Sequence, residues 1–233
     1  MKNHYTKMIR NVTASFIAGV SMVLVNSGHS EALPEPPAAT EGWVIVHESV
    51  WVSEINRPGH HFNRAMANFR QDKFELAALE IKRAAALLKV ESRRSSREGK
   101  KHLKAAAHRL RELSKKVKNG KVKSYFVLKE SFAGAHLALA ISNRILAEKA
   151  RGKKDTDQIG YELKSALRHL EHTSFWSGYR MSEAYLATQG NLERISQNLI
   201  DDLDVDDNEV IAAIEGIGSE LDRIIKETDI LFE

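Results

Sequence analysis

Proline is confined to the first 58 residues of the chain, and this distribution constrains the fold most strongly. The four prolines are Pro34, Pro36, Pro37 and Pro58, so no proline occurs in the remainder of the 233-residue sequence. Because proline removes a backbone donor and breaks helices, a long stretch without it favours helices. With 42% hydrophobic residues, the chain also has enough apolar side chains for a packed core. We therefore predict an all-α fold, a single antiparallel helical bundle of about five long helices over residues 60–233.

The N-terminus has the three parts of a secretory signal peptide in the expected order. Basic residues at Lys2, Lys7 and Arg10 precede an apolar run over 12–25, and Ser30-Glu31-Ala32 fits the small-x-small cleavage pattern. The apolar run is shorter than the roughly 20 residues that span a bilayer, which argues against an uncleaved anchor. We therefore expect residues 1–32 to be a cleaved signal peptide and the protein to be periplasmic and not an integral membrane protein.

The chain contains no cysteine, which excludes several classes of exported protein. A disulfide-stapled scaffold, a thiol enzyme, a lipid-modified N-terminus and a covalently attached haem all require this residue. The sequence also lacks a Gly-x-Ser-x-Gly turn, a phosphate-binding glycine loop and a His-Glu-x-x-His motif. We therefore expect a non-enzymatic protein and assign no catalytic residue.

The predicted signal peptide is followed by a segment without helical character. Three of the four prolines lie in residues 33–42, which we interpret as a linker. Residues 43–59 are rich in Val, Ile and Trp, as strands are, but no partner strand is evident elsewhere in the sequence. We predict an extended arm whose two tryptophans, Trp43 and Trp51, pack on the helices; the alternative is an arm that pairs with another protein.

Apolar side chains with helical spacing continue from His60 to the C-terminal region. Asp72 is a candidate cap between the first two helices, and Gly190 is a candidate break after the helix that begins at Thr156. Asp206 or its neighbour Asp207 is expected to cap the last helix. The most apolar helix is predicted over 122–151, and we expect it to be the central one.

The pattern Ala65-x-x-x-Phe69-x-x-Asp72-x-Phe74-x-x-Ala77 resembles one tetratricopeptide helical pair. No second copy follows, so a repeat array is not expected. Over residues 65–91, the segment also resembles exported bacterial helical proteins of the YfdX kind and similar uncharacterised families. This resemblance implies a periplasmic helical protein connected with stress or survival, with chaperone-like behaviour and no catalytic residues.

Charge is strongly separated along the chain. Residues 82–123 contain 16 Lys or Arg against three Glu, whereas residues 201–233 contain 12 Asp or Glu against two basic residues. The acidic C-terminal helix could pack beside the basic one, or the basic helix could bind an anionic partner such as a phospholipid surface or an acidic protein. Nucleic acid is not expected, because residues 92–124 offer no aromatic side chain for stacking. The predicted partner-binding surface comprises Arg93, Arg94, Arg97, Lys100, Lys101 and Lys104.

Histidines form the second candidate site. His169 and His172 lie three residues apart, a spacing that places two imidazoles on one helix face, and His136 of the central helix could face them. His60 and His61 begin the first helix. These five residues are candidate ligands for a transition metal or b-type haem. The simpler interpretation is that they are structural histidines that flank the core and form hydrogen bonds with their neighbours. We therefore predict an interaction or stress-protection protein of the cell envelope, able to form homo-oligomers; the alternative is a metal or haem carrier.

Overall fold

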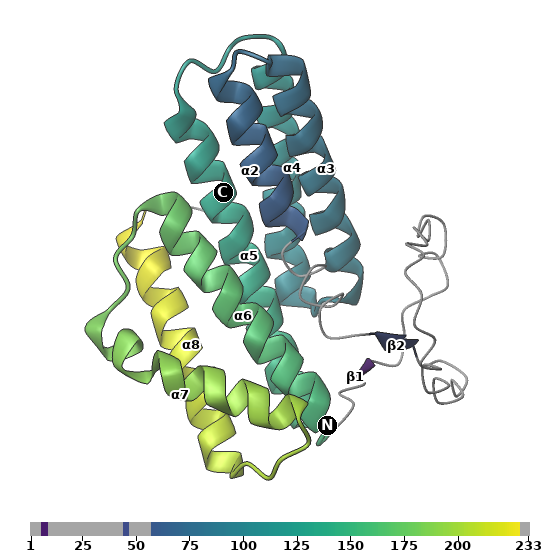
Figure 1. Ribbon diagram of the computed structural model, residues 1–233, viewed down its shortest axis with the longest axis vertical. Helices are drawn as coiled ribbons and strands as arrows, with labels where there is room; N and C mark the ends of the chain where they lie inside the picture. The colour runs from purple at the N-terminus through teal and green to yellow at the C-terminus, as the bar shows by residue number, and fades with distance from the viewer. Residues whose placement is uncertain (1–5, 9–43, 47–56, 229–233) are drawn as a thin grey trace, which may run out of the picture.

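The computed structural model describes residues 6–8, 44–46 and 57–228, and its helical content confirms the predicted all-α class (Figure 1). This part of the chain holds seven helices instead of about five. No described helix is both long and apolar enough to cross a membrane. The helices are α2 (Arg57–Arg70), α3 (Phe74–Arg94), α4 (Arg97–Lys118), α5 (Tyr125–Arg151), α6 (Thr156–Ser177), α7 (Glu183–Ile200) and α8 (Asp207–Glu227).

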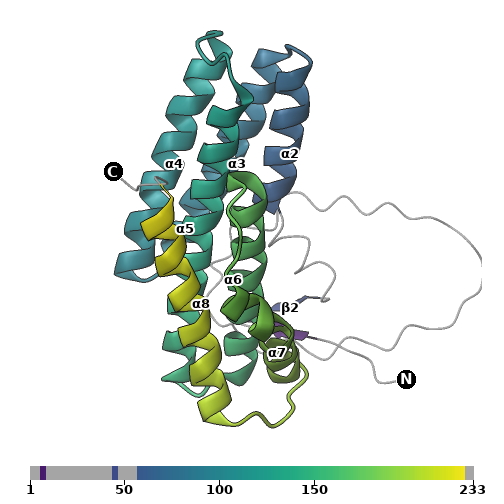
Figure 2. The ribbon, with the colours of Figure 1, turned by 90° about the vertical axis from the view of Figure 1, so that its left-hand side faces the viewer.

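The helix α5 is the longest and the central one, as predicted, and it belongs to both halves of the molecule. Helices α2, α3 and α4 pack in the upper half of Figure 1, and α6, α7 and α8 in the lower half. Successive helices from α2 to α6 run in alternating directions, which makes the bundle antiparallel, and α8 lies along the lower part of α5 (Figure 2). In Figure 1, α7 runs across the others. Residues far apart in sequence therefore meet on α5.

The N-terminal boundaries differ from the prediction. Helix α2 already begins at Arg57, so residues 57–59, which were assigned to the extended arm, form its first turn; proline is well tolerated there. The expectation that the arm has no strand partner is wrong, because β2 (Val44–Val46) pairs antiparallel with β1 (Thr6–Met8). The remainder of the predicted signal peptide, linker and arm lies outside the described residues.

Side-chain caps set most of the helix starts. Ser96 Oγ accepts a hydrogen bond from Gly99 N at 3.1 Å at the start of α4, and Asp206, one of the two predicted caps, performs this role for α8. Asp72 is not a cap: it has φ 57°, and Lys73 precedes α3 without a side-chain bond. Helix α6 ends at Gly178, whose φ of 73° is the left-handed conformation that glycine accepts readily.

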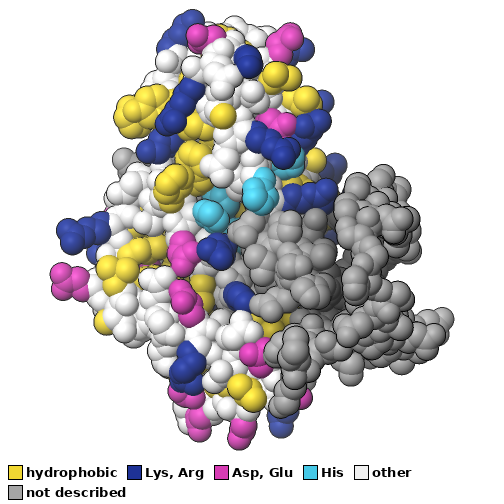
Figure 3. All heavy atoms as spheres, in the orientation of Figure 1, with side chains coloured by type: hydrophobic (Ala, Val, Ile, Leu, Met, Phe, Trp, Pro, Cys, Tyr) yellow, Lys and Arg dark blue, Asp and Glu magenta, His cyan; other side chains and the backbone are white. Residues whose placement is uncertain are grey.

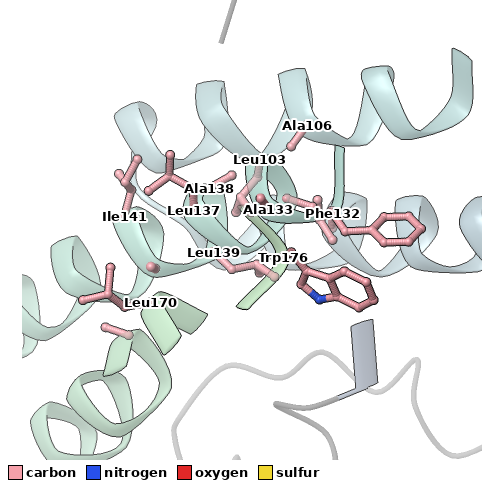
Figure 4. Close-up of a cluster of buried hydrophobic side chains, with 14 of the residues drawn as sticks. Leu103, Ala106, Phe132, Ala133, Leu137, Ala138, Leu139, Ile141, Leu170 and Trp176 are labelled. Atoms are coloured by element: carbon pink, nitrogen blue, oxygen red, sulfur yellow. The ribbon is translucent and has the colours of Figure 1, made fainter. Parts of the chain in front are cut away.

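The core includes residues of all the described helices and is centred on α5, which packs on both α4 and α6. Leu103 of α4, Leu137 of α5 and Leu170 of α6 are fully buried, and Figure 4 shows them among the apolar side chains of this cluster. Phe132 lies beside Trp176 with ring centroids 5.2 Å apart. Burying one large apolar side chain contributes about 1.5–3 kcal/mol, so each of these side chains stabilises the bundle substantially.

A close contact between α6 and α7 requires glycine at position 160. A Cβ there would lie 2.8 Å from the carbonyl oxygen of Ser196 and 2.9 Å from the backbone nitrogen of Ile200. We expect Gly160→Ala to lower the free energy of unfolding by about 1–3 kcal/mol, because the two backbones must separate. Gly190→Ala is the matched control: nothing lies within 4 Å of its Cβ position, so we expect stabilisation of about 0.5–1 kcal/mol. Equal effects in guanidinium unfolding would contradict this account.

Candidate functional site

Helix α4 presents a continuous basic face to solvent. Its apolar residues, among them Leu103, Leu110 and Val117, pack inwards against α3 and α5 and leave the opposite face exposed. Along a helix about 33 Å long, exposed basic residues recur every three or four positions. The face comprises Arg97, Lys101, Lys104, His108 and Arg111, with Lys115 and Lys118 in the last turn.

Five of the six predicted surface residues lie on or beside this face. Arg93, Arg97, Lys100, Lys101 and Lys104 are all exposed, and none of them forms an ion pair with a described residue. We call this set, together with the α4 face, the basic surface. Side chains that are exposed, cationic and without carboxylate partners are available to an anionic partner.

The acidic C-terminal helix does not neutralise the basic surface. Helix α8 packs on α5, α6 and α7, and its carboxylates pair elsewhere. Asp207 contacts Arg151 at 2.9 Å, and Glu209 contacts Arg194 at 2.7 Å. The structure therefore gives no support to the interpretation that α8 packs beside α4 and that the two helices screen each other's charge.

Arg94, the sixth predicted surface residue, is a structural residue instead. Its Nη1 donates to Glu162 Oε1 at 3.1 Å, and its Nε bonds Glu91. Burial alone would lower the pKa of Arg94, but the two carboxylates raise it above the ordinary value. Burial raises the pKa of Glu162, and Arg94 offsets part of this shift. Direct contact with the guanidinium of Arg94, which keeps its charge, favours the ionised form of Glu162.

Glu162 is a residue that the sequence analysis missed. It is 1% exposed and lies between Tyr161 and Leu163 on the buried face of α6. An ionisable side chain in the middle of an apolar helix face was the available signal, because such a residue is buried only with a partner.

The structure brings together the three predicted histidines of α5 and α6. His136 Nδ1 and His169 Nδ1 lie 3.1 Å apart, so one imidazole donates to the other. The ring of His172 stacks on that of His136 with centroids 4.7 Å apart. Phe62 of α2 also contacts the cluster, with its ring nearly perpendicular to that of His136 and the two ring centroids 5.2 Å apart. We call His136, His169 and His172 the histidine cluster.

The surroundings of the histidine cluster hold the imidazoles in the neutral form. Burial, followed by the two neighbouring histidines, lowers the pKa of His136 well below its ordinary value. Burial lowers the pKa of His169 to about 3, and the positive potential of His172, Arg94 and Arg168 acts in the same direction. The pKa of His172 is lowered by burial as well. Neutral imidazoles are the form in which histidine binds metals.

One nitrogen of the cluster has no hydrogen-bond partner in the part of the chain that the structure describes. His136 Nε2 is fully buried without a hydrogen bond in the described residues. A Cβ built at Gly59 would lie 3.8 Å from this atom and 3.9 Å from His172 Nε2. Both nitrogens therefore lie close to the same position beside Gly59 of α2. Nevertheless, no group of three or more His, Asp or Glu side chains in the described part of the chain is arranged to hold a metal ion.

The two histidines of α2 have separate environments. His61 bonds Glu80 of α3, which also pairs with Arg83, so His61 is directed away from the cluster. Although burial opposes it, these contacts lower the pKa of Glu80. His60 is exposed and lies close enough for its charge to lower the pKa of His172, after burial and Arg168. Histidine side chains are visible near the middle of the face in Figure 3.

Comparison with protein-family models, with curated proteins and with solved structures finds no match to this chain. The resemblance to YfdX-like proteins therefore stays a prediction. Residues 65–91, on which it was based, lie within the α2–α3 helical hairpin.

Proposed function

We propose that this protein is a non-enzymatic interaction protein of the bacterial cell envelope that binds an anionic partner through the basic surface. Export to the periplasm by the N-terminal signal is part of the proposal, as is a chaperone-like or stress-protective role. The observation that supports it is the row of exposed cations along α4, in which Arg97, Lys100, Lys101 and Lys104 form no ion pair with a described residue and Lys115 pairs with Glu112 of the same helix. A partner that supplies negative charge would be attracted from a distance and held by several contacts.

The proposal predicts salt-sensitive binding that depends on α4. We expect Lys100→Glu, Lys101→Glu and Lys104→Glu together to weaken binding to poly-L-glutamate, or to vesicles containing phosphatidylglycerol, by about tenfold or more, since each reversal replaces an attraction by a repulsion. Binding of the unaltered protein should also weaken as salt increases, because salt screens exposed charges. Sedimentation with vesicles and fluorescence anisotropy with labelled polyglutamate would measure both effects.

The matched control reverses three exposed lysines away from α4. Lys149→Glu, Lys153→Glu and Lys226→Glu change the net charge by the same amount, at the end of α5, in the α5–α6 turn and on α8. If this control weakened binding as much as the α4 variant, only net charge would matter and the basic surface would not be the contact site. If the unaltered protein bound neither poly-L-glutamate nor vesicles containing phosphatidylglycerol, the proposal would be overturned.

A transition-metal or b-type haem carrier is the second candidate function. The observation that favours it is His136 Nε2, which has no hydrogen-bond partner among the described residues and lies near the same position as His172 Nε2. Elemental analysis and an absorption spectrum of the protein from the periplasm would separate the two functions. Near-stoichiometric metal or haem that disappears in His169→Ala would support the carrier, and a colourless, metal-free protein would remove it.

A further inference from the structure

A groove of about 260 Å³ lies between α2, the start of α5 and the end of α6, and its lining includes no residue of the basic surface. Met66 and Trp176 form its apolar part, and Phe175 borders it. Arg70 and Lys129 also line it. Hydrophobic side chains gather over this upper part of the molecule in Figure 3.

The floor of the groove is held rigidly by the core. Trp176 is 5% exposed, and its ring meets the edge of Phe132 at an interplanar angle of 81° (Figure 4). Phe132 in turn stacks on Phe62 of α2 with ring centroids 4.3 Å apart. Because three helices fix these rings, the groove is formed before any ligand arrives, and binding requires little ordering.

Exposed aromatic side chains lie in the lining of the groove and beside its two cations. Phe175 is 66% exposed and Phe126 is 62% exposed, and Tyr125 stacks on Phe126. Single exposed apolar residues are common, but a contiguous exposed patch is typical of a binding surface. The helix ends that carry these residues thus expose aromatic surface that is not buried within the bundle.

The two cations of the groove have aromatic neighbours and no carboxylate partner in the described chain. The guanidinium of Arg70 lies 5.7 Å from the ring centroid of Tyr125, and Lys129 Nζ lies 6.0 Å from that of Phe126. Among the described residues that line the groove, none is Asp or Glu. The positive end of the α5 dipole, at Tyr125, adds to the potential. The groove is therefore apolar on its floor and positive on its rim.

We propose that this groove binds a single-chain amphiphile with one anionic head group, of the long-chain carboxylate class. The chain would lie on Met66 and Trp176 and under Phe175, and the head group would be held by Arg70 and Lys129. Drug-sized ligands occupy about 300–1,000 Å³, so this groove accepts part of one acyl chain and not a two-chain phospholipid. The proposal is independent of the anionic partner of α4.

The test uses Trp176 as the reporter, because it forms part of the groove. Trp43→Phe and Trp51→Phe leave it as the sole tryptophan of the full chain. Titration with sodium dodecanoate below its micelle concentration is expected to change the fluorescence with saturation at one molecule per protein. Arg70→Gln with Lys129→Gln should weaken this binding at least tenfold, and Phe175→Ser should weaken it several-fold.

Two controls make the outcome decisive. Lys121→Gln with Lys123→Gln removes the same charge from exposed positions of the α4–α5 loop and should leave dodecanoate binding unchanged. Dodecyltrimethylammonium, with the same chain and the opposite charge, should bind at least tenfold more weakly. Equal affinity for the cationic amphiphile, unchanged binding in the Arg70/Lys129 variant, or uptake without saturation would each overturn the proposal.

Discussion

Acidification from pH 7 to about pH 4 is expected to destabilise the helical bundle through the histidine cluster. Burial lowers the folded-state pKa of His136 and His172, and that of His169 to about 3. In the unfolded chain the same side chains titrate near 6.5. The unfolded state therefore binds more protons below pH 6.5, and the stability that is fully present above that value is lost progressively as the pH falls.

The expected loss is large compared with the stability of a domain. For His169 alone it is on the order of 3 kcal/mol at pH 4, since one pKa unit corresponds to about 1.4 kcal/mol. A domain typically has only about 5–15 kcal/mol in total. Burial raises the pKa of Glu162 and Glu171, so these carboxyls take up protons more readily in the folded state and offset part of the loss.

A histidine variant separates the contribution of the histidine cluster to the pH dependence of stability from the contribution of the carboxyl groups. Positive charge reaches the cluster from Arg94 of α3, Arg168 of α6 and His60 of α2, and all three remain in His169→Met. In guanidinium unfolding at pH 7, 5.5 and 4, this variant should lose less stability on acidification than the unaltered protein. His108→Gln, at an exposed position of α4, should behave as the unaltered protein does. Equal losses in all three proteins would contradict the assignment.

The fold was predictable where local pattern and packing agree. A chain without proline after Pro58 and with helical apolar spacing specifies helices, and the most apolar of them became the central α5. The break between α6 and α7 was placed at Gly190 but occurs at Gly178. Glycine inside a helix costs only about 1 kcal/mol, which the contacts of α7 with α6 and α8 offset, whereas Gly178 ends α6 because it adopts a positive φ.

The candidate sites were predictable only in part, because they join distant residues. The spacing of His169 and His172 placed both on one helix face, and the central position of α5 brought His136 to them. Charge pattern alone could not reveal that Arg94 turns inwards to Glu162, 68 residues further along the chain. The groove beside Trp176 combines three helices, and no local motif indicates it.

Arg94→Ala is expected to be the most destabilising single substitution of a residue in the predicted surface. It would leave the carboxylate of Glu162, which is 1% exposed, without its cationic partner. Breaking one side of a buried ion pair costs about 3–5 kcal/mol. Because the Arg94 side chain is 39% exposed and water screens it, we expect a value near the lower limit, about 3 kcal/mol.

The control for this prediction is the neighbouring residue. Arg93 is exposed and pairs with no described carboxylate, so Arg93→Ala should change the free energy of unfolding by no more than about 0.5 kcal/mol. Adding Glu162→Gln to Arg94→Ala should recover part of the loss, because it removes the unpaired charge and keeps the shape. If Arg94→Ala and Arg93→Ala had equal effects in urea unfolding, Arg94 would belong to the basic surface after all. A loss confined to Arg94→Ala would instead mean that the bundle depends on the ion pair that joins the end of α3 to α6.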